Sequence, residues 1–205
     1  MHTDLTGVVL AGGKSVRMGV NKAFLPFGNT TVIESIVAMM RRSFPEVLLS
    51  TNTPEEYRHL GLSIIPDYLD HAGPLAGIHA GLSAATTEKI FVISCDTPLM
   101  TSDIIDFIVR YPTTKPITVA RADGFVQQLC GVYSKSVLPK AEEIVQRRKI
   151  SPRKKKKLCP VLELVQLSDG AIIDIEHEYP DYKEGAFLNL NRPADVERLN
   201  VMMTK

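Results

Sequence analysis

Two adjacent glycines, Gly12 and Gly13, follow a short apolar run, and the basic residues Arg17 and Lys22 lie close behind them. Glycine tolerates positive φ and lets backbone N–H groups approach an anion closely. The pattern therefore predicts a loop that binds phosphate. It is not a Walker A motif, because Val8 stands where that motif needs its first glycine, and it is not G-x-G-x-x-G either. Spacing alone leaves open a plain glycine turn whose basic residues are merely solvated.

Asp96 stands at the end of the apolar run Ile90–Cys95 and two residues before Pro98. A carboxylate at the end of a buried strand offers the oxygen ligands that a hard cation such as Mg²⁺ prefers. The alternative is an Asx-type turn that leads into a helix beginning at Ser102. Asp96 is thus the candidate metal ligand.

Further polar residues follow other predicted strands. Asn52 and Asp67 come after the next two apolar runs, where they can contact a ligand at the same edge of a sheet. Asn189 and Asn191 are two residues apart on or beside a strand predicted over Ala186–Leu190, so their side chains are expected to share one face. The alternative for Asn191 is that it caps the final helix.

Apolar runs of strand length alternate with helical spacing over most of the chain. The pattern predicts a three-layer α/β/α fold of Rossmann-like, doubly wound type, with a mostly parallel sheet and right-handed crossovers, in a single domain over residues 1–205. Ligands of such sheets bind at the carboxyl ends of the strands. Strands are predicted at Gly7–Ala11, Val47–Ser50, Leu62–Pro66, Ile90–Cys95, Ile117–Ala120, Gln127–Tyr133, Val161–Leu167, Ala171–Ile175 and Ala186–Leu190, and helices at Thr31–Ser43, Ala76–Ala85, Ser102–Tyr111, Val137–Arg148 and Pro193–Met203.

The 205 residues carry 24 Lys and Arg against 23 Asp and Glu, a net charge of +1. This balance argues against nucleic acid or an anionic membrane as a partner. Eight of the positive charges lie in residues 147–157, a segment without acids. A flexible basic loop is predicted at residues 149–158, either simply solvated or acting as a lid that attracts a phosphate.

Cys95, Cys130 and Cys159 are widely spaced and form no C-x-x-C pair. Reduced thiols and a cytoplasmic location are the simplest interpretation, because the apolar stretch near the start is too short for a signal peptide or a membrane span.

The segment Leu10–Lys22 closely resembles the LAGGxSxRMGxDK signature of nucleotidyltransferases that activate sugars, polyols and pterins, and most specifically that of molybdenum cofactor guanylyltransferases. Three further segments resemble motifs of the same family: Gly73–Ile78 its GPLAG segment, Cys95–Pro98 its CDxP, and Asn189–Asp195 its NxNxPxD. The resemblance extends from residue 7 to about residue 198.

This resemblance implies a nucleotide-diphospho-sugar transferase fold and the transfer of GMP from GTP to molybdenum-bound molybdopterin, with release of pyrophosphate. Such a transfer requires charge neutralisation, an oriented acceptor and Mg²⁺, and needs no protein nucleophile. It also implies that molybdoenzymes or cofactor-insertion proteins receive the product. The residues it points to are Lys22, Arg17 and Asp96 for catalysis, with Asp96 as Mg²⁺ ligand; Leu10, Ala11, Gly12, Gly13, Asn52 and Asp67 for the nucleotide; and Asn189 and Asn191 for the pterin.

Two details of the resemblance are open. The nucleotide-binding asparagine of the family aligns either with Asn52 or with Ser50. The residue before the lysine is often aspartate in the family, whereas it is Asn21 here, which predicts a less firmly tethered Lys22.

Two other functions remain compatible with the sequence. A cytidylyltransferase acting on molybdopterin or on a polyol phosphate would share the glycine loop. A non-catalytic carrier of nucleotide or cofactor would share the fold, although Arg17, Lys22 and Asp96 are all present.

Overall fold

The computed structural model describes residues 1–12, 21–66, 69, 72–150 and 159–203. The predictions for Gly13, Arg17 and Asp67, and for residues 151–158 of the basic segment, lie outside the described residues. In the described part of the chain, no helix is long and apolar enough to cross a membrane.

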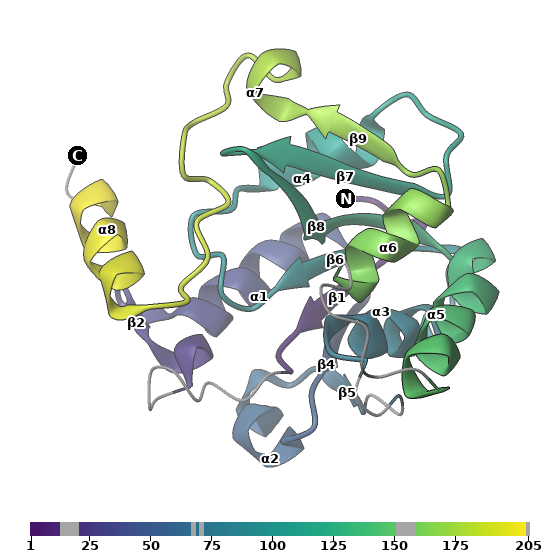
Figure 1. Ribbon diagram of the computed structural model, residues 1–205. Helices are drawn as coiled ribbons and strands as arrows, with labels where there is room; N and C mark the ends of the chain where they lie inside the picture. Colours follow the sequence, from purple (N-terminus) through teal and green to yellow (C-terminus); the bar gives the residue numbers. More distant parts are fainter. Residues whose placement is uncertain (13–20, 67–68, 70–71, 151–158, 204–205) are drawn as a thin grey trace.

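A seven-stranded sheet forms the centre of the molecule, in the order β5-β4-β1-β6-β8-β7-β9 (Figure 1). All neighbouring pairs are parallel except those of β8, which runs antiparallel to β6 and β7. The predicted mostly parallel α/β sheet is thereby confirmed. The strands are β1 (Leu5–Leu10), β4 (Val47–Ser50), β5 (Ser63–Ile65), β6 (Lys89–Ser94), β7 (Ile117–Ala122), β8 (Phe125–Ser134) and β9 (Ala171–Asp174).

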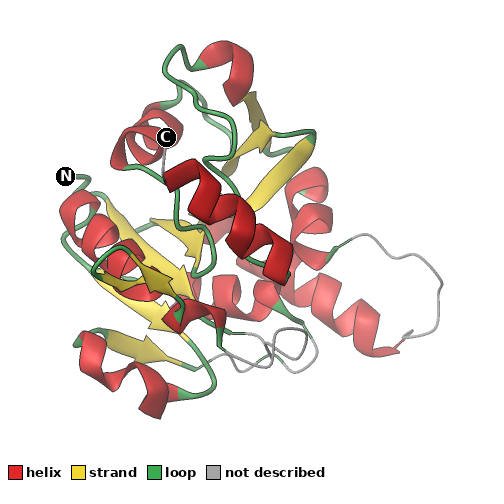
Figure 2. Cartoon of the chain, turned by 90° about the vertical axis from the view of Figure 1, so that its left-hand side faces the viewer, coloured by secondary structure: helices red, strands yellow, loops and turns green. Residues whose placement is uncertain are grey.

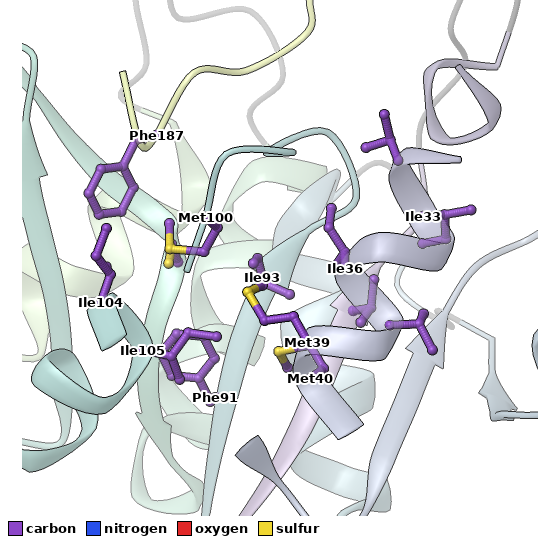
Figure 3. Packing of buried hydrophobic residues seen from close by; sticks show 14 of the residues in the cluster. Ile33, Ile36, Met39, Met40, Phe91, Ile93, Met100, Ile104, Ile105 and Phe187 are labelled. Carbon is purple, nitrogen blue, oxygen red and sulfur yellow. The ribbon is translucent and has the colours of Figure 1, made fainter. Parts of the chain in front are cut away.

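Helices cover both faces of the sheet, and alternate strand residues point into two separate apolar layers. In β1, Val9 belongs to the layer under α1 (Val32–Ser43) and α4 (Ser102–Arg110). Val8 belongs to the opposite layer, which α3 (Pro74–Ala84), α5 (Leu138–Ile150) and α6 (Pro160–Leu167) cover. Figure 3 shows how α1 and α4 enclose large side chains of the first layer, among them Met40, Phe91 and Ile105.

The helices begin where local signals favour it. The α1 helix starts after Thr31, whose hydroxyl accepts a hydrogen bond from the Glu34 amide at 3.4 Å, while the Glu34 carboxylate accepts one from the Thr31 amide at 2.9 Å. This is a capping box, which satisfies two backbone donors at the helix end. The α3 helix follows Gly73, whose φ of 58° favours glycine, and has Pro74 in its first turn.

Several short elements lie outside the predicted set. They are η1 (Lys22–Phe24), β2 (Pro26–Phe27), β3 (Thr30–Thr31), α2 (Pro54–Tyr57), η2 (Arg58–Leu60), η3 (Lys135–Val137) and α7 (Ile175–Glu178). The predicted final helix is α8 (Pro193–Met203), which lies at the front of the molecule in the view of Figure 2.

Two predicted strands are wrong. Val161–Leu167 is the helix α6, in which Val161, Leu164 and Val165 are buried, a helical i, i+3, i+4 spacing that the short apolar run disguised. Pro160 occupies the first turn, where a missing N–H costs nothing.

Ala186–Leu190 belongs to no strand. It is an irregular segment in which the Ala186 amide donates to Lys183 and the Leu188 amide to Gly185. Residues 186–188 and 190 are buried, so the apolar run marks burial and not strand pairing.

Candidate functional site

The candidate site lies at the carboxyl edge of the sheet, beyond β1 and β6. The chain runs outward from β1 to β4 and β5, and then returns to β6 on the other side of β1. This reversal of strand order opens a crevice at the strand ends in α/β sheets. The register places Leu10 beside both Ser50 and Ser94, so the three strands end at the same level.

Lys22 and Asp96 meet at this edge, although they are 74 residues apart in the sequence. The Lys22 ammonium lies 3.8 Å from Oδ2 of Asp96 and donates a hydrogen bond of 2.7 Å to Oδ1 of Asn191. The side chains of Lys22 and Asp96 are each 17% exposed. The structure thus brings together one residue from each of three separate sequence motifs.

Asp96 is held through both its side chain and its backbone. Its Oδ1 accepts a 2.6 Å hydrogen bond from the Ser94 hydroxyl, and its backbone carbonyl accepts one of 3.0 Å from the Leu190 amide. The cap of α4 is formed by Thr101, whose hydroxyl accepts from the Ile104 amide, so capping of that helix does not account for Asp96.

The segment that carries Asn189 and Asn191 differs from the prediction of two side chains on one strand face. The Asn189 side chain donates to the carbonyl of Phe187 at 3.0 Å, whereas that of Asn191 reaches Lys22. At the start of α8, the Asp195 carboxylate accepts the amides of Asn191 and Arg192, each at 2.7 Å. The acceptor at this helix end is therefore Asp195, and the Asn191 side-chain oxygen accepts from Lys22.

Leu10 and Ala11, which are predicted to bind the nucleotide, are both buried, and their backbone groups already form hydrogen bonds. The Ala11 amide donates to the Ser50 carbonyl at 2.8 Å, and its carbonyl accepts from the Thr51 hydroxyl at 3.2 Å. The Leu10 carbonyl accepts from the Cys95 amide at 3.0 Å. Because its amide is already engaged, Ala11 can offer a base only the second lone pair of its carbonyl.

Ser50 and Asn52 are distinguished by burial. Ser50 is 2% exposed, and its hydroxyl oxygen lies only 2.8 Å from where a Cβ on Gly77 would stand. Asn52, beyond the end of β4, is exposed. Of the two alignments, only the one that uses Asn52 gives a side chain that a ligand can reach.

Asn21 is held by α2 rather than by the site. Its side chain donates to the Glu56 carboxylate at 2.7 Å and to the Tyr57 hydroxyl at 3.0 Å. The Lys22 ammonium is tethered by other groups, since it donates to Asn191 and lies 3.8 Å from Asp96.

A nucleophilic role for the neighbouring thiol is disfavoured. Burial, together with the adjacent Asp96 carboxylate, raises the pKa of Cys95 to about 12. The thiol therefore stays protonated at neutral pH, and the thiolate is the reactive form.

The donor set suits a cation that brings most of its own ligands. Among the described residues, no three His, Cys, Asp or Glu side chains group together in a way that would hold a metal ion. Mg²⁺ is commonly held by one or two carboxylates with water and phosphate oxygens. A single fixed carboxylate at Asp96 fits that mode of binding and does not fit an all-protein cage.

Comparison with known families decides the wider assignment. Residues 7–158 match the model of the MobA-like NTP transferase domain. The chain belongs to this family. It is 36% identical over 198 residues to a protein of Carboxydothermus hydrogenoformans named probable molybdenum cofactor guanylyltransferase, with 96% of this chain and 95% of the relative covered. The resemblance drawn from the sequence motifs is thereby confirmed.

Solved structures show the same fold. Molybdopterin-guanine dinucleotide biosynthesis protein A from Archaeoglobus fulgidus is similar with a TM-score of 0.78, at 18% identity and with 98% of this chain and 99% of that chain covered. A 4-diphosphocytidyl-2C-methyl-D-erythritol synthase from Anaerococcus prevotii is similar with a TM-score of 0.71, at 11% identity, covering 99% and 97%. The fold therefore accommodates proteins named for different nucleotides.

Sequence reasoning missed three contributors to the site. Ser94 holds Asp96, the Leu190 amide binds the Asp96 carbonyl, and Asn21 links η1 to α2. Ser94 had a readable signal, because it lies two residues before the carboxylate at the end of the same strand. The other two depend on contacts between distant segments, for which the sequence offers no local signal.

Proposed function

We propose that the protein transfers GMP from GTP to the terminal phosphate of molybdopterin carrying molybdenum, and releases pyrophosphate. The observation that carries the proposal is the placement of the Lys22 ammonium between Asp96 and Asn191, at the crevice where the sheet order reverses. Membership of the MobA-like family and the printed name of the Carboxydothermus relative support GTP and molybdopterin as substrates.

Lys22 serves to bind and neutralise the triphosphate. An ammonium has three donors, of which one goes to Asn191, so others can be directed to phosphate oxygens. At 17% exposure, the charge is screened less than on an open surface and acts more strongly on a bound anion. The leaving pyrophosphate gains charge as the bond to the α-phosphate breaks, and a positioned cation stabilises that charge.

Asp96 is the residue that would hold Mg²⁺. When bound, the ion would neutralise phosphate charge and polarise the phosphoryl group under attack. The protein's own contribution is to fix the carboxylate: Ser94 orients Oδ1, which leaves Oδ2 directed toward the Lys22 side of the crevice.

Asn191 and Asn189 come from the segment before α8 and are assigned to the pterin acceptor. Asn191 contacts Lys22 directly, so an acceptor that binds near Asn191 lies beside the triphosphate. Holding both substrates in one crevice converts a bimolecular transfer into an effectively unimolecular step.

The test is a comparison of GTP with CTP as donors to molybdenum-loaded molybdopterin, with and without Mg²⁺, following pyrophosphate release and the dinucleotide product. We expect turnover with GTP that requires Mg²⁺, and little with CTP. A preference for CTP would replace the guanylyltransferase assignment with the cytidylyltransferase one. Tight GTP binding without turnover, in the presence of acceptor and Mg²⁺, would instead support the carrier alternative.

A further inference from the structure

Asn21 sits between the site and the short helix α2 and makes hydrogen bonds on both sides. Its Nδ2 donates to Oε2 of Glu56 at 2.7 Å and to the hydroxyl of Tyr57 at 3.0 Å. Its Oδ1 accepts the amide of Ala23 at 3.2 Å and caps the single turn η1, whose first residue is Lys22. One side chain thus joins α2 to the turn that carries the site lysine.

The α2 end of this arrangement is firmly anchored. Tyr57 is 1% exposed, and its ring stacks on that of Phe24 with centroids 5.2 Å apart. Phe24 is the last residue of η1, so the turn is held by a ring contact at one end and by the Asn21 amide at the other. Because this short turn is fixed at both ends, the position of the Lys22 backbone, from which the side chain extends, is restricted.

We propose that Asn21 is a positioning residue, which acts through Glu56, Tyr57 and Ala23 to place the Lys22 ammonium against Asp96 and Asn191. Its role in turnover rests on the proposed function, whereas its effect on the position of Lys22 does not. In this chain the amide group serves both contacts, because it donates to Glu56 and accepts from the Ala23 amide. Only a carboxamide supplies both in a side chain of this length.

An aspartate at position 21 would keep the acceptor and lose the donor. Two carboxylates at the 2.7 Å spacing of Asn21 and Glu56 repel each other when both are charged, which favours a proton shared between them at low pH. At low pH the shared proton restores a hydrogen bond. As the pH rises, the shared proton and the hydrogen bond to Glu56 are lost, and the Tyr57 hydroxyl remains as the contact between position 21 and α2.

Other titratable groups near this cluster are present in the wild-type protein as well, so their effect on the pH profile cancels when each variant is compared with the wild type. Burial raises the pKa of Tyr57 to about 12, so it stays protonated throughout the range used. Glu55 and Arg58 lie on the same short segment, and the His59 ring lies 5.9 Å from that of Phe24. Cys95 also stays protonated, as described above. Lys22 and Asp96 are not substituted in any of the variants.

The experiment compares Asn21→Asp, Glu56→Gln and the double variant Asn21→Asp/Glu56→Gln with the wild type between pH 6 and 8.5. In Asn21→Asp, we expect kcat/KM for GTP, relative to wild type, to fall by about tenfold as the pH rises. The Glu56→Gln variant should follow the wild-type profile, because its amide oxygen still accepts from Asn21. The double variant should recover, because the introduced glutamine amide can donate to the introduced aspartate carboxylate.

A second measurement reports on Lys22 without requiring activity. Each protein is treated briefly with an amine-acetylating reagent, and the labelling of Lys22 is quantified by mass spectrometry relative to Lys89, which is exposed at the start of β6. We expect labelling of Lys22 to rise several-fold in Asn21→Asp at pH 8 and to return toward wild type in the double variant. Asn29→Asp, in the exposed turn between β2 and β3, is the matched control and should change neither readout.

The two readouts separate the proposals. Unchanged Lys22 labelling in Asn21→Asp, or no recovery in the double variant, would overturn the positioning role whatever the activity. A wild-type protein that does not turn over GTP, but whose Lys22 labelling follows the expected pattern, would overturn the proposed function and keep the positioning role.

Discussion

The amino-terminal part of the chain, up to the end of α4, and the carboxyl-terminal part from β7 onward build the site in different ways. The first supplies Asp96 just after β6, a strand whose end the β1 register fixes, and Lys22 from the short turn η1. The second supplies Asn191 from an irregular segment that crosses the sheet edge, with the Leu190 amide hydrogen-bonded to the Asp96 carbonyl. Positions set by a strand ladder are strongly constrained, whereas positions set by a few loop contacts are less so.

This difference has a functional meaning under the proposed reaction. Asp96 follows directly on the strand β6, and a strand end is a rigid support that suits a group that must be placed accurately. The acceptor side rests on a loop and on α8, where the hydrogen bond between Lys22 and Asn191 joins the two parts. Variants in each part should therefore differ in the size and kind of their effect.

The largest effect is expected from Asp96→Asn, which removes the charge at the rigid edge and keeps the shape of the side chain. The asparagine can still accept from Ser94, so folding should be retained. Turnover of GTP should fall on the order of 1,000-fold, as when a group that stabilises transition-state charge is lost. Steady-state kinetics and thermal unfolding measure the two properties separately. Asp4→Asn, exposed before β1 at the opposite edge of the sheet, is the control, and equal losses in both variants would contradict the assignment.

The next effect concerns the packing that supports the rigid part. Gly81 of α3 lies so close to β1 that a Cβ there would stand 2.9 Å from a methyl carbon of Val8 and 3.2 Å from Ile90. Gly81→Leu should lower the free energy of unfolding by about 2–3 kcal/mol, because overpacking forces side chains or backbone to move. Denaturant unfolding measures the loss. Ser83→Ala, on the exposed side of the same helix, should be nearly neutral, and a neutral Gly81→Leu would show that α3 can move away from the sheet.

The same division explains how much could be predicted from the sequence. Buried parallel strands produce continuous apolar runs, so β1, β4 and β6 were located within about two residues, and the carboxylate after β6 was found with them. Val161–Leu167 and Ala186–Leu190 have equally apolar runs, but one is a helix and the other an irregular segment. Composition cannot separate these cases, because burial alone demands apolar residues.

The site shows a similar limit. The position of Asp96 predicts a metal ligand, and the family resemblance adds roles for Lys22 and Asn191, but the contacts among the three arise only when distant segments meet. The contact of Asn21 with Glu56 cannot be predicted from the sequence, because Glu56 lies on α2, a helix of four residues that no periodic pattern reveals. Ser50 and Asn52 were distinguished only by burial under α3.

A smaller functional effect is expected on the loop side of the crevice. Asn191→Ala removes the oxygen that accepts from the Lys22 ammonium and leaves the Asp96 edge intact. We expect kcat to fall about tenfold, the loss typical of one hydrogen bond to a charged group. Rates at saturating GTP and acceptor measure this. Glu197→Gln on the exposed surface of α8 is the control. A loss as large as that in Asp96→Asn would remove the distinction between the two sides.

The smallest effect is expected from the capping box at the start of α1, which involves only residues of the amino-terminal part. Hydrogen bonds from Thr30 and Thr31 lower the pKa of Glu34 from 4.5 to about 2. A carboxyl with a lowered pKa in the folded state adds stability above its unfolded pKa, and this stability is lost as the pH falls toward the folded value. In Glu34→Gln, the melting temperature should therefore lie slightly below that of the wild type at pH 6, and the gap should close between pH 4.5 and about 2. Glutamine retains a capping acceptor, which keeps the gap small. A gap that stays constant over this range would show that the Glu34 charge does not contribute to the start of α1.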